Sequence, residues 1–165
     1  METNNILDDK FSNVDFSKVT FRGKLAGKSW KLEQALDRLA QVRIVIFVMT
    51  ALVFYPVFVN YFVYDVFTPD LFIERLVFSL ILLLCGIFFE KNRLIAIIAA
   101  LLPLGLILAI YLFLQPEYFS VKRVGFLVAI FSMVALGILF HFKAKRFRKE
   151  LVAEVRKGNP LAIVN

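Results

Sequence analysis

The sequence predicts an all-α membrane protein, with four transmembrane helices in a compact antiparallel bundle, both termini in the cytoplasm, and a short amphipathic helix before the first span. Composition is the first reason. Hydrophobic residues make up 60% of the 165 residues and the mean hydropathy is +0.76, well above the roughly 45–50% apolar content of a soluble domain. The second reason is that most charged residues lie before Ile44 or after Phe142, as expected if the region between them lies in a bilayer.

Four apolar segments are predicted to cross the membrane, at about residues 43–64, 71–89, 94–114 and 124–142. A helix needs about 20 apolar residues to cross roughly 30 Å of hydrocarbon, and the first, third and fourth segments reach this length. The second is free of charge only over residues 76–89, which is about 21 Å of helix. It therefore spans only if Glu74 and Arg75 lie near one membrane face, where the arginine can snorkel. A helical hairpin that stays on one side of the membrane is the alternative.

Lysine and arginine residues are distributed unequally between the two sides that an even number of spans creates. The side with the termini has Lys28, Lys31, Arg38, Arg43, Lys91, Arg93, Lys143, Lys145, Arg146, Arg148, Lys149, Arg156 and Lys157 close to the spans. The other side has Arg75, Lys122 and Arg123. By the positive-inside rule both termini are cytoplasmic. We expect an integral, multi-pass protein of the bacterial cytoplasmic (inner) membrane, oriented N-in and C-in.

The parts outside the spans divide into a leader, a helix and a tail. Residues 1–28 are predicted to be largely extended or disordered, residues 29–42 to form an amphipathic cytoplasmic helix, and residues 143–165 to form a basic tail, while residues 43–142 make up the transmembrane domain. In the helix, Ser29 is the predicted N-cap. Its apolar face has helical spacing and consists of Leu32, Ala35, Leu36, Leu39 and Val42. This helix either docks on another element or lies on the membrane with Trp30 among the headgroups.

Three groups of residues are candidates for a functional role. An outer polar cluster, which could instead be an aromatic belt with a structural asparagine, consists of Asn60, Tyr64, Glu74, Arg75, Tyr111 and Gln115. A face of small residues for helix packing in the fourth span consists of Gly125, Ala129 and Gly137. A basic cluster that could contact anionic lipid consists of Lys143, Lys145, Arg146, Arg148 and Lys149.

No catalytic, cofactor-binding or metal-binding residues are predicted. The single histidine, His141, and the single cysteine, Cys85, have no metal-ligand pattern around them, and no phosphate-binding or nucleophile motif occurs. We therefore expect a non-enzymatic subunit or an accessory or assembly factor of a larger membrane protein complex. Its expected partners are the lipid bilayer, anionic lipid headgroups, and other membrane subunits or further copies of itself, but not nucleic acid. The alternative is a small oligomeric transporter or channel with an outward-facing polar site.

Overall fold

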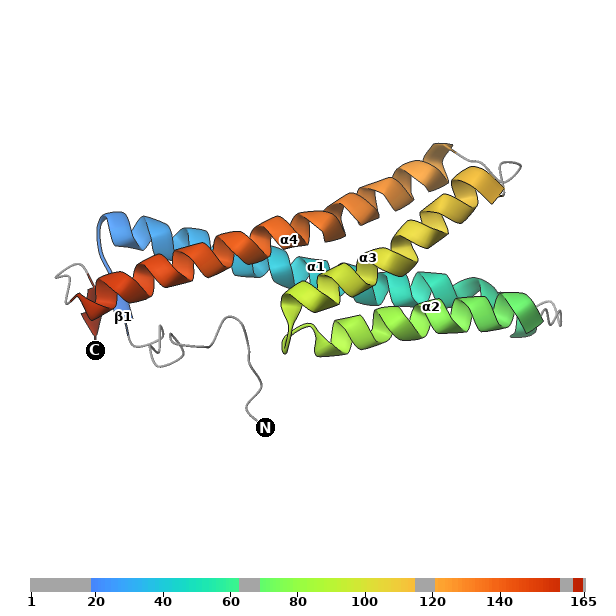
Figure 1. Cartoon of the computed structure of the whole chain (residues 1–165), viewed down its shortest axis with the longest axis horizontal. Coiled ribbons are helices and arrows are strands. Elements are labelled where there is room, and N and C mark those ends of the chain that lie inside the picture. Colours follow the sequence, from blue (N-terminus) through green and yellow to red (C-terminus); the bar gives the residue numbers. More distant parts are fainter. Residues whose placement is uncertain (1–18, 63–68, 115–120, 158–161, 165) are drawn as a thin grey trace. The chain divides into compact units, whose positions relative to one another are not determined.

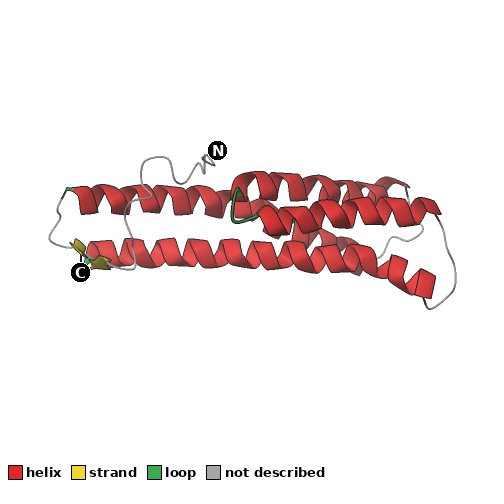
Figure 2. Ribbon diagram, turned by 90° about the horizontal axis from the view of Figure 1, so that it is seen from below, coloured by secondary structure: helices red, strands yellow, loops and turns green. Residues whose placement is uncertain are grey.

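The computed structural model describes residues 19–62, 69–114, 121–157 and 162–164 (Figure 1). In this part of the chain the predicted all-helical class is confirmed, with the addition of one small sheet (Figure 2). The elements are β1 (Val19–Phe21), α1 (Lys24–Phe62), α2 (Pro69–Phe88), α3 (Arg93–Ala109), the π-helical turn η2 (Ile110–Leu114), α4 (Val121–Arg156) and β2 (Ala162–Val164).

The chain divides into two compact units. The first, which we call the end unit, contains residues 1–40 and 139–165, and the second, the middle unit, contains residues 41–138. Helices α1 and α4 contribute to both units, whereas α2 and α3 belong to the middle unit alone.

Helix α1 begins earlier than the sequence predicted. It starts at Lys24, so Ser29 lies inside the helix and the prediction that it is the N-cap was wrong. The chain leaves β1 through Gly23, whose φ of 55° is a left-handed conformation that glycine adopts without strain. A hydrogen bond from the Leu25 amide to the Arg22 carbonyl closes this turn at 3.2 Å. The predicted amphipathic helix and first span are therefore one continuous helix that passes through Pro56.

Helix α4 also extends beyond its predicted segment. The apolar run ends at Phe142, but the helix continues to Arg156, so most of the predicted basic tail is helical. Two helices, over Lys24–Val59 and Val124–Val155, are long and apolar enough to cross a membrane, and Arg93–Ala109 is a shorter apolar helix. Helix α2, and α3 with η2, coincide closely with the second and third predicted segments.

The buried side chains of α1 and α4 recur every three or four residues, as in the heptad pattern of coiled coils. On α1 the buried positions are Leu32, Ala35, Leu39, Val42, Ile46, Met49, Val53 and Val57. On α4 they include Val134, Gly137, His141, Ala144 and Leu151. Each helix therefore has one apolar stripe that runs through both units.

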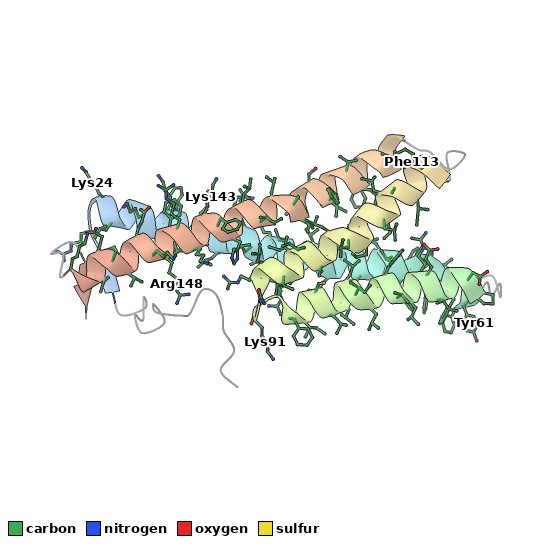
Figure 3. All side chains as sticks on the ribbon, viewed as in Figure 1. Lys24, Tyr61, Lys91, Phe113, Lys143 and Arg148 are labelled. Atoms are coloured by element: carbon green, nitrogen blue, oxygen red, sulfur yellow. The ribbon has the colours of Figure 1, made fainter. Side chains whose placement is uncertain are left out.

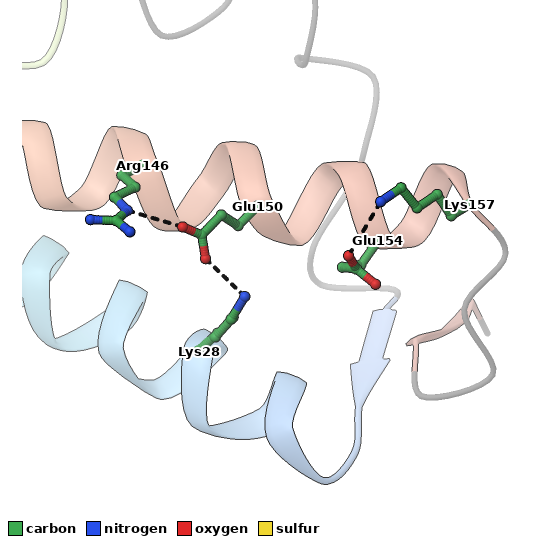
Figure 4. A network of polar contacts seen from close by, with 5 residues as sticks. All are labelled: Lys28, Arg146, Glu150, Glu154 and Lys157. Carbon is green, nitrogen blue, oxygen red and sulfur yellow. Dashed lines mark hydrogen bonds and ion pairs between the residues drawn. The ribbon is translucent and has the colours of Figure 1, made fainter.

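In the end unit, the first turns of α1 and the last turns of α4 lie side by side, and β1 and β2 pair next to them (Figures 1 and 4). The strands are antiparallel, with Val19 opposite Val164 and Phe21 opposite Ala162. The buried side chains of this unit come from both helices. On α1 they extend from Leu25 to Leu39, and on α4 they are Ala144, Leu151 and Val152. The amphipathic stripe thus has a helical partner within the chain, which agrees with the docking interpretation rather than the interfacial one.

Candidate functional site

An ion-pair network connects the two helices of the end unit (Figure 4). The Glu150 carboxylate accepts from Lys28 Nζ of α1 at 2.8 Å and from Arg146 Nε of α4 at 3.0 Å. The hydrogen bond from Lys28, together with that from Arg146, holds the pKa of the Glu150 carboxyl below its usual range. One turn further along, Lys157 pairs with Glu154 at 3.7 Å. Only the Lys28–Glu150 pair joins the two helices, since the other two pairs lie within α4 or at its carboxyl end. All three are partly exposed, so each contributes little to stability.

The predicted basic cluster lies on this part of α4, and its members are not equivalent. Arg146 is held by Glu150, and Arg148 also has an interaction partner. Lys143 lies over the Phe140 ring at 5.9 Å from the ring centre, in the range of a cation–π contact. Lys143 and Lys149 are exposed, and Figure 3 shows Lys143 and Arg148 among the charged side chains of this helix. The exposed positive charge of the cluster is thus concentrated on its lysines and on Arg146.

Outside residues 44–142, the described part of the chain has two exposed large apolar side chains, Trp30 at 61% and Leu36 at 36% exposure. Leu36 was predicted to belong to the apolar face of the helix, but it lies at the edge of that face and is not buried. Trp30 lies 14 positions before Ile44, or about 21 Å along a helix. An exposed tryptophan in an otherwise polar surface is a candidate contact for another protein.

In the middle unit, Gly86 of α2 lies against the Phe47 ring of α1. A Cβ atom at this position would lie 2.6 Å from Cε1 of the ring, so only glycine fits without a shift of the ring. Small residues at helix contacts are common in membrane proteins. The sequence contained this glycine but no pattern that distinguished it.

Arg43 of α1 closes the carboxyl end of α2. Its Nε donates to the Gly86 carbonyl at 3.2 Å, its Nη1 pairs with the Glu90 carboxylate, and its guanidinium lies 5.7 Å from the centre of the Phe47 ring. Gly86 has one of the last four carbonyls of α2, which lack partners within the helix, and a cation there also complements the helix dipole. Asn92 then caps α3, since its Oδ1 accepts from the Ile95 amide at 3.5 Å.

The predicted small-residue face of α4 is divided. Gly137 is buried, and a Cβ atom there would lie 3.2 Å from side-chain atoms of both Val42 and Ile97, so this glycine serves packing within the chain. Gly125 and Ala129 are exposed, and no atom lies within 4 Å of a Cβ built at Gly125. These two positions leave an open small-residue surface on α4.

A groove of about 340 Å³ lies between α1 and α2. Its lining is almost entirely apolar and consists of Phe47, Thr50, Ala51, Phe54, Leu76, Ser79, Leu80 and Leu83. The two hydroxyls in this lining donate to carbonyls of their own helices, Thr50 to Ile46 at 3.0 Å and Ser79 to Leu76 at 3.0 Å. The groove therefore offers an apolar surface rather than a polar path.

Of the predicted outer polar cluster, the structure describes the side chains of Glu74 and Arg75 only. The side chains of Asn60 and Tyr111, and residues Tyr64 and Gln115, lie outside the described part. Glu74 and Arg75 are both partly buried. The Arg75 Nε atom is shielded from solvent and has no hydrogen-bond partner among the described residues. The charged pair is thus present at the predicted place on α2, and the arginine is left with unused hydrogen-bonding capacity.

The outer surface of the middle unit is apolar. In the most apolar 18-residue windows of α1 and α4, only 28% and 22% of residues are buried, whereas the core helix of a soluble protein is mostly buried. Large exposed apolar side chains of α2 and α3 include Ile73, Val77, Leu80, Leu84, Ile95, Ile98, Leu102 and Leu106. In Figure 3, mostly carbon-coloured side chains project from α2 and α3, with Lys91 at the turn between them.

Among the described residues, no group of three or more His, Cys, Asp or Glu side chains is arranged to hold a metal ion. His141 is 5% exposed and has an interaction partner, and Cys85 is a buried free thiol. Comparison with known protein families, with curated proteins and with solved structures finds no match. The function has to be argued from the geometry of the two units.

Proposed function

We propose that the chain is a four-span membrane protein with a cytoplasmic two-helix stalk, the end unit, and that it acts as a non-enzymatic subunit or accessory factor of a larger membrane complex. The observation that carries this proposal is the contact of Arg43 with Gly86 and Glu90. Arg43 immediately precedes the apolar part of α1, and Glu90 lies in the turn after α2. This contact favours a turn between α2 and α3 at the same membrane face as the start of the first span.

Two observations support four spans. Residues 19–40, 139–157 and 162–164 belong to one compact unit, and in the proposed arrangement this unit lies on one side of the membrane, with an even number of crossings. In this arrangement α2 returns to the face where Arg43 lies, so α2 and α3 cross as a pair. Helix α2 has 20 residues, or about 30 Å, which matches the hydrocarbon thickness.

The stalk follows from helix length. Helix α1 has 39 residues and α4 has 36, about 58 Å and 54 Å of helix, against roughly 30 Å of hydrocarbon. The excess carries the lysines and arginines that the positive-inside rule assigns to the cytoplasm. The exposed tryptophan of the end unit and the open small-residue surface of the middle unit suit a protein that contacts other chains through both units.

Isolation of the full chain in mild detergent, followed by mass measurement and identification of bound chains, tests the proposal. We expect unrelated chains in fixed stoichiometry with the wild type, and at least a tenfold smaller amount with Trp30→Ala if the tryptophan is an interface anchor. Glu33→Ala, an exposed change on the same helix, is the matched control and should retain the partner chains. A preparation that contains only a homo-oligomer would overturn the subunit proposal and favour the oligomeric transporter or channel.

The topology is tested separately by cysteine labelling in a Cys85→Ala background. Probes at Asp70, in the first turn of α2, should react from the outside, and probes at Lys31 and Lys149 only after the membrane is made permeable. If a cysteine at Asp70 reacted only from the cytoplasmic side, α2 would not cross the membrane in the proposed direction.

A further inference from the structure

We infer that the groove between α1 and α2 binds one phospholipid of the outer leaflet, with an acyl chain in the groove and the phosphate at Arg75. This inference rests on the proposed topology, in which the amino end of α2 lies at the outer face. It assigns to the groove an occupant of defined chemistry, a phosphodiester joined to an alkyl chain, and it gives the unpartnered arginine a function.

The shape and chemistry of the groove fit an alkyl chain. Its volume of about 340 Å³ is at the low end of ligand sites, which range over roughly 300–1,000 Å³, so it suits part of a lipid rather than a whole one. On α2 it extends from Leu76 to Leu83, about 10 Å along the helix axis. Because Thr50 and Ser79 already donate to backbone carbonyls, a purely apolar occupant leaves neither hydroxyl unpaired.

Arg75 is positioned to hold the headgroup. Leu76, the next residue, and Ser79, one turn further along, both line the groove, so residue 75 lies at its outer end. Helical side chains lean toward the amino end of their helix, which in the proposed topology directs the guanidinium toward the outer headgroups. A phosphate there would complement the charge of Arg75, whose side chain is only partly buried.

Native mass spectrometry of the purified full chain, titrated with phosphatidylglycerol, tests the inference. The wild type should retain one lipid, and Arg75→Gln should weaken its binding about tenfold, as expected for loss of a charge-assisted hydrogen bond. Ala51→Phe, which fills the groove, should weaken it by at least as much. Val48→Phe is the matched control, because Val48 is exposed on the same helix but does not line the groove, and it should bind lipid as the wild type does.

Three further measurements show whether the bound lipid is held through its phosphate at Arg75, through its acyl chains alone, or at the cytoplasmic basic cluster. Diacylglycerol with the same acyl chains should bind about tenfold more weakly than phosphatidylglycerol, and millimolar inorganic phosphate should not displace the lipid. Lys149→Gln, in the cytoplasmic basic cluster, should not change binding. Each of four results would overturn the inference. These are lipid binding that neither Arg75→Gln nor Ala51→Phe weakens, equal binding of diacylglycerol and phosphatidylglycerol, displacement of the lipid by free phosphate, and an equal loss of binding with Lys149→Gln.

The same preparation separates failure of the inference from failure of the proposed function. If the chain stays in the membrane fraction during alkaline carbonate extraction and binds partner chains, the proposed function stands. If that chain then retains no phospholipid, only the lipid site is wrong. If the chain is extracted from the membranes, the membrane topology on which both depend is wrong.

Discussion

The end unit and the middle unit have the same spacing of buried residues, but their exposed surfaces differ in polarity. The apolar stripe of α1 continues with three- and four-residue spacing from Leu32 in the end unit to Val57 in the middle unit. On the other faces of the same helix, Lys31, Gln34 and Asp37 are exposed in the end unit, whereas Ile44, Val48 and Leu52 are exposed in the middle unit. The buried face thus keeps one spacing along α1, whereas the exposed faces change from polar in the end unit to apolar in the middle unit.

The two units also differ in what holds their helices together. In the end unit, burial of Leu39 and its neighbours is supplemented by the Lys28–Glu150 ion pair. In the middle unit, Gly86 lies against the Phe47 ring and Gly137 lies against the side chains of Val42 and Ile97. A side chain at Gly86 would meet the ring, and one at Gly137 would require its neighbours to shift slightly.

Among the changes that test this comparison, Leu39→Ala is expected to lower the free energy of unfolding most. Leu39 is 1% exposed, and its truncation in a water-surrounded unit should cost about 2–5 kcal/mol. Leu36→Ala, on the same helix but partly exposed, is the control and should cost less than about 1 kcal/mol. Hydrogen exchange of the α1 amides in the end unit measures both. Equal protection in the two variants would mean that the stripe is not buried in the end unit.

A lysine at Leu102 tests whether the surface of the middle unit faces lipid. Leu102 is 72% exposed near the centre of the third predicted span, so in water Leu102→Lys would be harmless, but in a bilayer it should cost about 2.5–3.5 kcal/mol of insertion free energy. Trp30→Lys makes the same charge change on the end unit and should have no effect on insertion. The readout is the fraction of newly made chain that resists carbonate extraction. Normal insertion of the Leu102→Lys chain would contradict the lipid-facing assignment.

Gly86→Ala is expected to have a smaller effect. Its new Cβ would meet the Phe47 ring at 2.6 Å, and such overpacking costs about 1–3 kcal/mol. Gly125→Ala has open space around it and should stabilise the isolated chain by about 0.5–1 kcal/mol through helix propensity. Thermal unfolding of both variants in detergent provides the comparison. A melting temperature for Gly86→Ala at or above that of Gly125→Ala would show that the approach of α1 to α2 is not close.

Acidification should produce the smallest effect, and it should be confined to the end unit. Because the partners of Glu150 lower the pKa of its carboxyl, the ionised carboxylate stabilises the folded unit at neutral pH. This contribution is lost as the pH falls through the lowered pKa. The protection factors of the amides in the last turns of α4, which are corrected for the intrinsic exchange rate at each pH, should therefore fall at acid pH in the wild type. This fall should be smaller in Glu150→Gln. The same fall in both proteins would rule out this ion pair as its cause.

The sequence predicted the helices well because hydropathy is a local property. The segments at 71–89 and 94–114 coincide with α2 and with α3 and η2 to within about two residues, the usual uncertainty at helix ends. The fourth segment was predicted as a span that ends at 142. Helix α4 continues beyond it to Arg156, because apolar character stops at residue 142 but helical propensity does not. Hydropathy indicates where a membrane ends, whereas capping determines where a helix ends.

The contacts between segments were harder to predict. Arg43 and Glu90 are the charges that flank the first and second spans, so their pairing had a signal that could have been used. Gly137, predicted to belong to a helix-packing face, lies against Val42 and Ile97, but nothing in the sequence distinguished it from the exposed Gly125. The pairing of Val19 with Val164 had no local signal, since three-residue strands depend on their partner for stability.

The β1–β2 pair has a consequence for the order of events during synthesis. Val19 leaves the ribosome before any helix of the chain, and its partner Val164 follows only after α4. Until then the α1 stripe from Leu25 to Leu39 has no α4 against which to pack, although α1 itself has already been made. Helix α1 is thus made well before its α4 partner, and the small sheet can close only after β2 has been synthesised.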